Sequence, residues 1–127
     1  MSHALQIALM VMGVGRILLG IAPFIAAGPA SRLLGFPAEQ DSPTARLMGR
    51  FFGVRDIGLG VLAFYAVRNP ATLVFVLLFN ACMDGGDLLS TAIPLIRRQG
   101  IDRAALGSAA CALVGGLSWV GTYAFLA

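Results

Sequence analysis

The stretch Arg50-Phe-Phe-Gly-Val-Arg55-Asp56-Ile-Gly-Leu-Gly60 places charged side chains inside an otherwise apolar segment. Working outward from it, the other apolar segments of the chain carry charges as well. In total there are three arginines and three aspartates in such segments: Arg16, Arg50, Arg55, Asp56, Asp84 and Asp87. Charges among hydrocarbon side chains are costly, so these six residues are the main indication of what the protein does.

The composition is that of an integral membrane protein. Of 127 residues, 58% are hydrophobic and only 12% are charged, and the mean hydropathy is +0.86. A chain of this length forms one folding unit, so we expect a single domain over residues 1–127. The net charge of +3 is spread over loops, without the basic stripe and interleaved aromatics that nucleic acid requires. The expected partner is therefore the lipid bilayer, and nucleic acid is excluded.

The apolar segments predict an all-α fold, an integral membrane antiparallel four-helix bundle with short loops. The spans are expected at residues 4–27, 43–67, 71–96 and 103–126. Asp41 or Ser42 followed by Pro43 is a typical helix start, and Arg68-Asn69-Pro70 is a tight reversal. Within the first connection, residues 30–36 are expected to form one short helical turn at the interface. Trp119 and Tyr123 are expected at the membrane interface, where aromatic residues are common.

The arginines outside the spans predict the orientation in the membrane. Cytoplasmic loops carry an excess of arginine and lysine. The first and third connections hold most of the loop arginines, whereas the turn between the second and third spans holds Arg68 alone. Both termini are therefore expected outside. The arginines on the cytoplasmic side would be Arg32, Arg46, Arg97, Arg98 and Arg103.

The polar residues of the third span share one face. Asn80, Asp84, Asp87 and Thr91 are spaced by four, three and four residues, which brings them to one narrow stripe of a helix. In the third span, Gly85 and Gly86 also follow Asp84 directly, a pair that hints at a broken helix of the kind transporters use. The stripe is expected to face the bundle interior rather than lipid.

The other spans also have a small or polar face. In the second span this face consists of Gly49, Gly53, Asp56 and Gly60, and in the first span of Gly13, Arg16 and Gly20. Glycine lets a neighbouring helix approach closely. The fourth span offers Ser108, Cys111, Gly115, Ser118 and Thr122.

Depth indicates that the charges meet. Arg16, Arg55, Asp56 and Asp84 each lie near the middle of their span, so they should come together at the bilayer midplane. An unpaired Arg or Asp there costs about 2.5–3.5 kcal/mol, so six would cost on the order of 15–20 kcal/mol. Mutual pairing, hydrogen bonding or water must remove most of that cost.

These residues resemble those of a known family. The segment Arg16-Ile-Leu-Leu-Gly20, the connection from Pro29 to Pro37 and the block from Arg50 to Gly60 are similar to a group of small four-span membrane proteins from bacteria and fungi, loosely DoxX-like. The resemblance rests mainly on the Arg-x-x-Gly-x-Arg-Asp block and covers most of the chain. It implies the fold and the importance of this block, but no reaction. The expected location is a bacterial inner (plasma) membrane.

Three functions are compatible with such a cluster. The first is a membrane-embedded enzyme that acts on a lipophilic small molecule by hydration, isomerisation or epoxide opening. The catalytic residues would then be Asp84 and Asp87 as acid and base, with Arg16 and Asp56 setting their charge, and Asn80, Arg50 and Arg55 would bind the substrate.

The second function is a small proton-coupled transporter or carrier that binds a proton or polar solute at the same residues. Four short spans leave little room for alternating access unless the protein forms a homodimer. The third is a non-catalytic membrane subunit, whose buried ion pairs fix the helix partners. No metal or cofactor is expected, because the one histidine, His3, stands at the chain start and the two cysteines lack a paired spacing.

Overall fold

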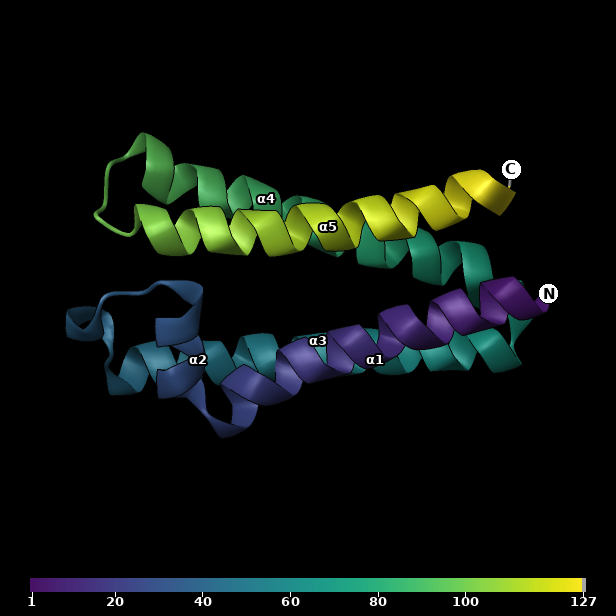
Figure 1. Cartoon of the computed structure of the whole chain (residues 1–127), viewed down its shortest axis with the longest axis horizontal. Coiled ribbons are helices and arrows are strands. Elements are labelled where there is room, and N and C mark those ends of the chain that lie inside the picture. The colour runs from purple at the N-terminus through teal and green to yellow at the C-terminus, as the bar shows by residue number, and fades with distance from the viewer. Residues whose placement is uncertain (127) are drawn as a thin grey trace.

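The computed structural model describes residues 1–126, and every regular element in that range is helical (Figure 1). Five α-helices are joined by short connections, two of which contain a 3-10 turn. The helices are α1 (His3–Ile25), α2 (Ala27–Leu34), α3 (Pro43–Arg68), α4 (Leu73–Ile96) and α5 (Asp102–Leu126), and the turns are η1 (Ala38–Gln40) and η2 (Pro70–Thr72).

Three helical segments are long and apolar enough to cross a membrane. They are His3–Ile25, Pro70–Ile96 and Asp102–Leu126. Helix α3 has 26 residues and is equally long, but Arg50, Arg55 and Asp56 lower its apolar content. The membrane character predicted from composition is thus supported for three of the four expected spans.

Helices α1 and α3 pack closely side by side (Figure 1). Gly20 and Gly53 face each other so closely that a Cβ on either would overlap the backbone oxygen of the other. Gly13 and Gly60 form a second such pair, in which a Cβ on Gly60 would lie 2.6 Å from the Gly13 oxygen. Because the earlier glycine of α1 meets the later glycine of α3, the two helices run in opposite directions. The predicted glycine faces are confirmed as the contact between them.

Helices α4 and α5 form the other pair (Figure 1). Apolar side chains join the two pairs near the start of α1 and the end of α5. This core draws on all four long helices. It consists of Leu5, Leu9, Ala63, Ala66, Leu73, Val76, Leu77 and Trp119. At the opposite end α2 packs on the start of α5, where a Cβ on Gly107 would lie 2.8 Å from the backbone oxygen of Leu34. The charged residues lie between these two regions.

The first connection differs from its predicted form. Helix α2 has eight residues and begins at Ala27, directly after the break at Ala26, so it is longer than the single turn expected over residues 30–36. It ends at Gly35, whose φ of 111° is readily adopted only by glycine. The start of α3 matches its prediction, since the Ser42 hydroxyl accepts a hydrogen bond from the Ala45 amide at 3.1 Å.

Trp119 is buried inside the bundle. Its side chain is only 2% exposed and belongs to the core between the helix pairs, whereas Tyr123 is 37% exposed. Trp119 follows Gly115 by one helical turn and therefore shares the inward face of α5. The expected depth of both aromatic residues at the membrane interface stays a prediction.

Candidate functional site

Arg16 and Asp84 form the central ion pair of the site. The Arg16 Nη1 atom of α1 donates to Asp84 Oδ1 of α4 at 2.5 Å, and the two side chains are 7% and 1% exposed. Arg16 is brought to this position by the close approach of α1 to α3, since it lies between Gly13 and Gly20 on the same face. The pair therefore links the α1–α3 unit to the α4–α5 unit.

Asp56 lies between the two arginines. Its Oδ1 atom is 3.7 Å from Arg16 Nε and 3.3 Å from Arg55 Nη2, and its side chain is 2% exposed. Because Asp56 is on the glycine face of α3, the contact of α1 with α3 buries it. One carboxylate is thus shared by two guanidinium groups.

Arg55 and Asp87 form a second link between the helix pairs. Arg55 donates to both carboxylate oxygens of Asp87, at 2.8 Å from Nη1 to Oδ1 and 2.6 Å from Nη2 to Oδ2. The guanidinium carbon also lies 4.7 Å from the centre of the Phe52 ring. Such a two-pronged contact fixes both side chains. Both residues are partly buried, with exposures of 28% and 26%.

The structure thus brings together five of the six charges. Arg50 does not join them: its side chain is exposed and has no ion pair within residues 1–126. Asn80 is fully buried one turn before Asp84, and its Nδ2 atom donates to the Val76 oxygen at 3.0 Å. We call the five joined residues the charge cluster: Arg16, Arg55, Asp56, Asp84 and Asp87.

Several polar atoms of the charge cluster lack a hydrogen-bond partner within residues 1–126. They include Arg16 Nε and Nη2 and Asp84 Oδ2. A buried polar group without a partner costs about 1–3 kcal/mol. The two arginines and three aspartates also carry a formal charge of −1, because +2 and −3 do not cancel. The cluster can therefore take a further hydrogen-bond acceptor at Arg16, and one added proton would bring its formal charge to zero.

The backbone of helix α5 closely approaches this pair at Gly115. A Cβ on Gly115 would lie 2.7 Å from Asp84 Oδ2 and 3.6 Å from Arg16 Nη1. Gly115 was predicted on the inward face of its helix but not as part of the site. The sequence does not specify the register of α4 against α5, and this register places Asp84 beside Gly115.

A cavity of about 430 Å³ opens between α1 and α5 beside the charge cluster. Arg16 is the one charged residue among the described residues that line it, and Gly115 closes it toward Asp84. The volume is within the range of small-molecule sites, roughly 300–1,000 Å³. The lining residues are Met12, Gly15, Arg16, Leu19, Ala110, Cys111, Val114, Gly115, Ser118 and Trp119.

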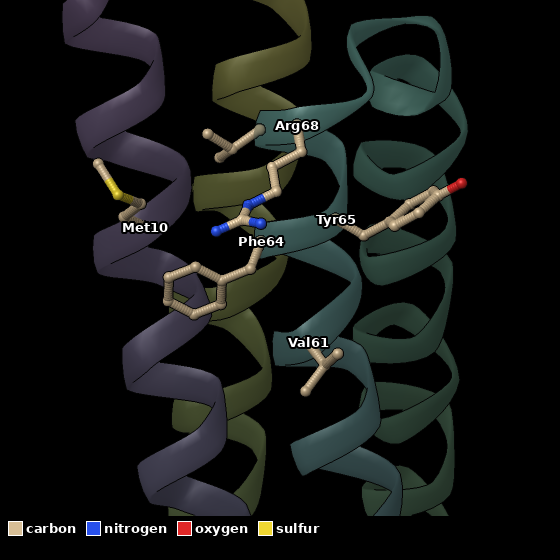
Figure 2. A pocket seen from close by; sticks show the side chains of 6 residues that line it. Met10, Val61, Phe64, Tyr65 and Arg68 are labelled. Carbon is tan, nitrogen blue, oxygen red and sulfur yellow. The ribbon is translucent and has the colours of Figure 1, made fainter.

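A second cavity, of about 510 Å³, lies between the N-terminal half of α1 and the C-terminal end of α3. Figure 2 shows Met10 of α1 facing Phe64 and the guanidinium of Arg68, while the Tyr65 side chain points away from them. Apart from Arg68, its described lining residues are uncharged. None of its described lining residues belongs to the charge cluster. We therefore assign the candidate site to the cavity between α1 and α5.

Comparison with protein families gives one match, to a domain of unknown function, DUF4267, over residues 13–126. The match includes every residue of the charge cluster. The chain belongs to the DUF4267 family. Membership of DUF4267 supports the uncharacterised membrane family expected from the sequence, whereas the DoxX-like relation stays a prediction. No curated protein and no solved structure matched this DUF4267 chain.

The two carboxylates of α4 in this DUF4267 chain differ in how they are held. Asp84 has one oxygen held by Arg16 and one without a hydrogen-bond partner within residues 1–126. In Asp87, by contrast, Arg55 occupies both oxygens. Within residues 1–126, no group of three or more His, Cys, Asp or Glu side chains is placed to hold a metal ion.

Proposed function

We propose that this integral membrane protein binds a lipophilic small molecule in the cavity between α1 and α5 and performs acid/base chemistry on it at Arg16 and Asp84. The observation that carries the proposal is the position of Arg16, which lines an apolar cavity and holds Asp84 directly behind the cavity wall at Gly115. A purely structural ion pair needs no adjoining cavity. A binding site for a lipophilic molecule needs both the apolar lining and a few polar groups that fix its orientation.

The roles of the charged residues follow from their partners. Asp84 would be the proton acceptor and donor through Oδ2, and Arg16 would hold the substrate and keep the other Asp84 oxygen in place. Asp56 would balance Arg16, while the Arg55–Asp87 pair would hold α3 against α4. Asn80 would support the Asp84 turn of α4, since its amide donates to the Val76 oxygen of the same helix.

Isomerisation is the simplest reaction of this type. Asp84 would remove a proton from a carbon atom next to a polarised C=O bond, and the electron pair would shift toward the oxygen held by Arg16. The same proton would return to another carbon of the substrate. This scheme balances without any further reactant. Hydration and epoxide opening would in addition consume one water molecule.

The proposal includes a fourth span and an orientation. Helix α3 packs along α1 over the distance between the two glycine pairs, and short turns connect it to α4. A helix held this way against a spanning neighbour would itself cross the bilayer. Both chain ends lie at one end of the molecule, and α2 and the α4–α5 connection lie at the other (Figure 1). The arginine-rich connections would face the cytoplasm and the termini the outside.

The test compares lipid-soluble metabolites in cells that produce the wild type or variants. Asp84→Asn keeps the size of the side chain but removes its proton chemistry, and Gly15→Leu fills the cavity without touching any charge. The matched control is Gly58→Leu, because a Cβ at Gly58 also meets open space but lies away from the cavity. We expect a pair of compounds related by isomerisation or one water to change in the wild type and Gly58→Leu only. A folded Asp84→Asn protein with the wild-type metabolite profile would overturn the proposal.

One observation favours a second candidate, a non-catalytic membrane subunit. All three carboxylates of the charge cluster are ion-paired, and the Arg16–Asp84 and Arg55–Asp87 pairs both connect α4 to the α1–α3 unit. On this reading the cluster only holds the helix pairs together, and Gly15→Leu would leave every phenotype intact. Transport has no comparable support, because α4 continues as a helix from Leu73 to Ile96 through the Gly85-Gly86 pair.

A further inference from the structure

The polar group of a ligand in the cavity between α1 and α5 would meet Arg16. This side chain is 7% exposed and lines the cavity, and its Nη2 and Nε atoms have no hydrogen-bond partner within residues 1–126. Both atoms are hydrogen-bond donors, and a guanidinium has no acceptor. The Ser118 hydroxyl of the cavity wall already donates to the Val114 oxygen at 2.7 Å. The ligand group recognised here must therefore be a hydrogen-bond acceptor.

The charge around Arg16 decides between a neutral and an anionic acceptor. Asp84 at 2.5 Å and Asp56 at 3.7 Å already balance this guanidinium. The charge cluster as a whole has a formal charge of −1, so an anionic ligand would raise it to −2 in a region of low dielectric constant. A neutral oxygen can receive the Nη2 hydrogen bond without this repulsion.

We infer that the cavity between α1 and α5 selects neutral lipophiles that carry a hydrogen-bond acceptor oxygen, such as a ketone, ester or epoxide, over both hydrocarbons and carboxylates. This inference rests on the proposed function and specifies its substrate class. The apolar wall receives the hydrocarbon part, and Arg16 receives the oxygen. Protein atoms cover the Nη2 atom of Arg16. The flexible Arg16 side chain must therefore turn slightly for this atom to reach the ligand.

Trp119 provides a local reporter of binding. It is the only tryptophan in the chain, it lines the cavity, and its side chain is 2% exposed. A bromine atom quenches indole fluorescence at contact distance. Quenching of Trp119 that is lost when the cavity is filled by Gly15→Leu therefore reports a brominated molecule inside the cavity.

The experiment uses the full chain in lipid nanodiscs and three probes with the same mid-chain-brominated alkyl group: a methyl ketone, the alkane and the carboxylate. At equal mole fraction in the lipid, we expect the ketone to bind about tenfold more tightly than the alkane, as one charge-assisted hydrogen bond implies. We expect a similar preference over the carboxylate, because its negative charge would be repelled by the charge cluster. Gly15→Leu should abolish quenching, and Gly58→Leu should leave it unchanged. Should Gly15→Leu not fold, Cys111→Leu fills the same cavity, with Cys82→Leu as its control outside it.

The outcomes separate this inference from the proposed function. If the carboxylate or the alkane quenches as well as the ketone, and Gly15→Leu still blocks quenching, the selectivity inferred here is wrong while the cavity remains a binding site. If no probe quenches Trp119 in the wild type, the inference and the proposed binding site both fall. The metabolite comparison with Asp84→Asn tests the chemistry independently of any of these probes.

Discussion

Asp84 of α4 lies directly against the backbone of Gly115 in α5, so that a Cβ on Gly115 would come within 2.7 Å of the Asp84 Oδ2 atom. The carboxylate is held on its other side by Arg16 of α1. Three helices therefore meet at one carboxyl group. The position of the Asp84 carboxyl group depends on the absence of a side chain at Gly115 as much as on the positive charge of Arg16.

Gly115→Ala is expected to destabilise the protein. The added methyl group must displace Asp84 or separate α4 from α5, and overpacking of this kind typically costs about 1–3 kcal/mol. The measurement is thermal unfolding in detergent, followed by Trp119 fluorescence. Gly121→Ala is the matched control on the same helix, because a Cβ there meets nothing within 4 Å. Equal stability of the two variants would contradict the close approach of Gly115 to Asp84.

Gly53→Ala is expected to disrupt the contact between α1 and α3. Its Cβ would overlap the backbone oxygen of Gly20, which cannot move without shifting the whole helix. We expect loss of stability of at least about 1–3 kcal/mol, together with lower yield of folded protein. Gly58→Ala, on the same helix with open space around it, should stay at or slightly above the wild type, since alanine favours a helix. The contact is not formed as described if both variants unfold at the same temperature.

The sequence predicted where the charges gather because helix periodicity determines which residues share a face. Asp84 and Asp87 follow the stripe that begins at Asn80, and the glycines on either side of Arg16 and Asp56 mark a helix contact. The partners could not be predicted in this way. Which arginine meets which aspartate depends on the register of α4 against the α1–α3 unit, which no local pattern specifies.

Two differences from the predictions have physical causes. Arg50 was expected beside the cluster, but its phase on α3 leaves it exposed. The length of α2 was missed because its glycine and proline residues are typical of a loop.

The stability of the first connection should depend on pH through Asp41. Arg46 donates to both carboxylate oxygens of Asp41, each at 2.8 Å, and this hydrogen bonding lowers the pKa of Asp41 below its ordinary value. The lowered pKa means that the folded state holds the proton less tightly than the unfolded state. The contribution to stability is therefore complete above the unfolded pKa of about 3.9 and is lost as the pH falls through the lower folded pKa.

Thermal unfolding of Asp41→Asn measured between about pH 5 and pH 2 tests this dependence. We expect the variant to lack the part of the acid destabilisation that comes from Asp41. Glu39→Gln is the control, because Glu39 is exposed in the same connection and has no ion pair within residues 1–126. Identical pH profiles for the wild type and Asp41→Asn would show that the pair with Arg46 does not stabilise the fold.

Replacing one partner of the Arg16–Asp84 pair should destabilise the protein more than replacing both partners. Arg16→Met leaves the buried Asp84 without its hydrogen-bond donor, and Asp84→Leu leaves Arg16 with Asp56 at 3.7 Å. Breaking a buried pair by removing one partner typically costs about 3–5 kcal/mol, whereas replacing both partners by apolar residues is often near neutral. The double variant is therefore expected to unfold at a higher temperature than either single variant. Arg50→Met, which removes an exposed arginine without an ion pair in residues 1–126, should change stability little.

The double variant also separates stability from chemistry. If the pair only holds the helices, a folded Arg16→Met/Asp84→Leu protein keeps the wild-type metabolite profile, because apolar packing replaces the ion pair. If the pair acts on a ligand, the same folded protein loses that profile, since neither the acceptor site at Arg16 nor the carboxyl group of Asp84 remains. Additive losses of stability in the two single variants would contradict the coupling itself, and with it the idea that the two side chains act as one unit.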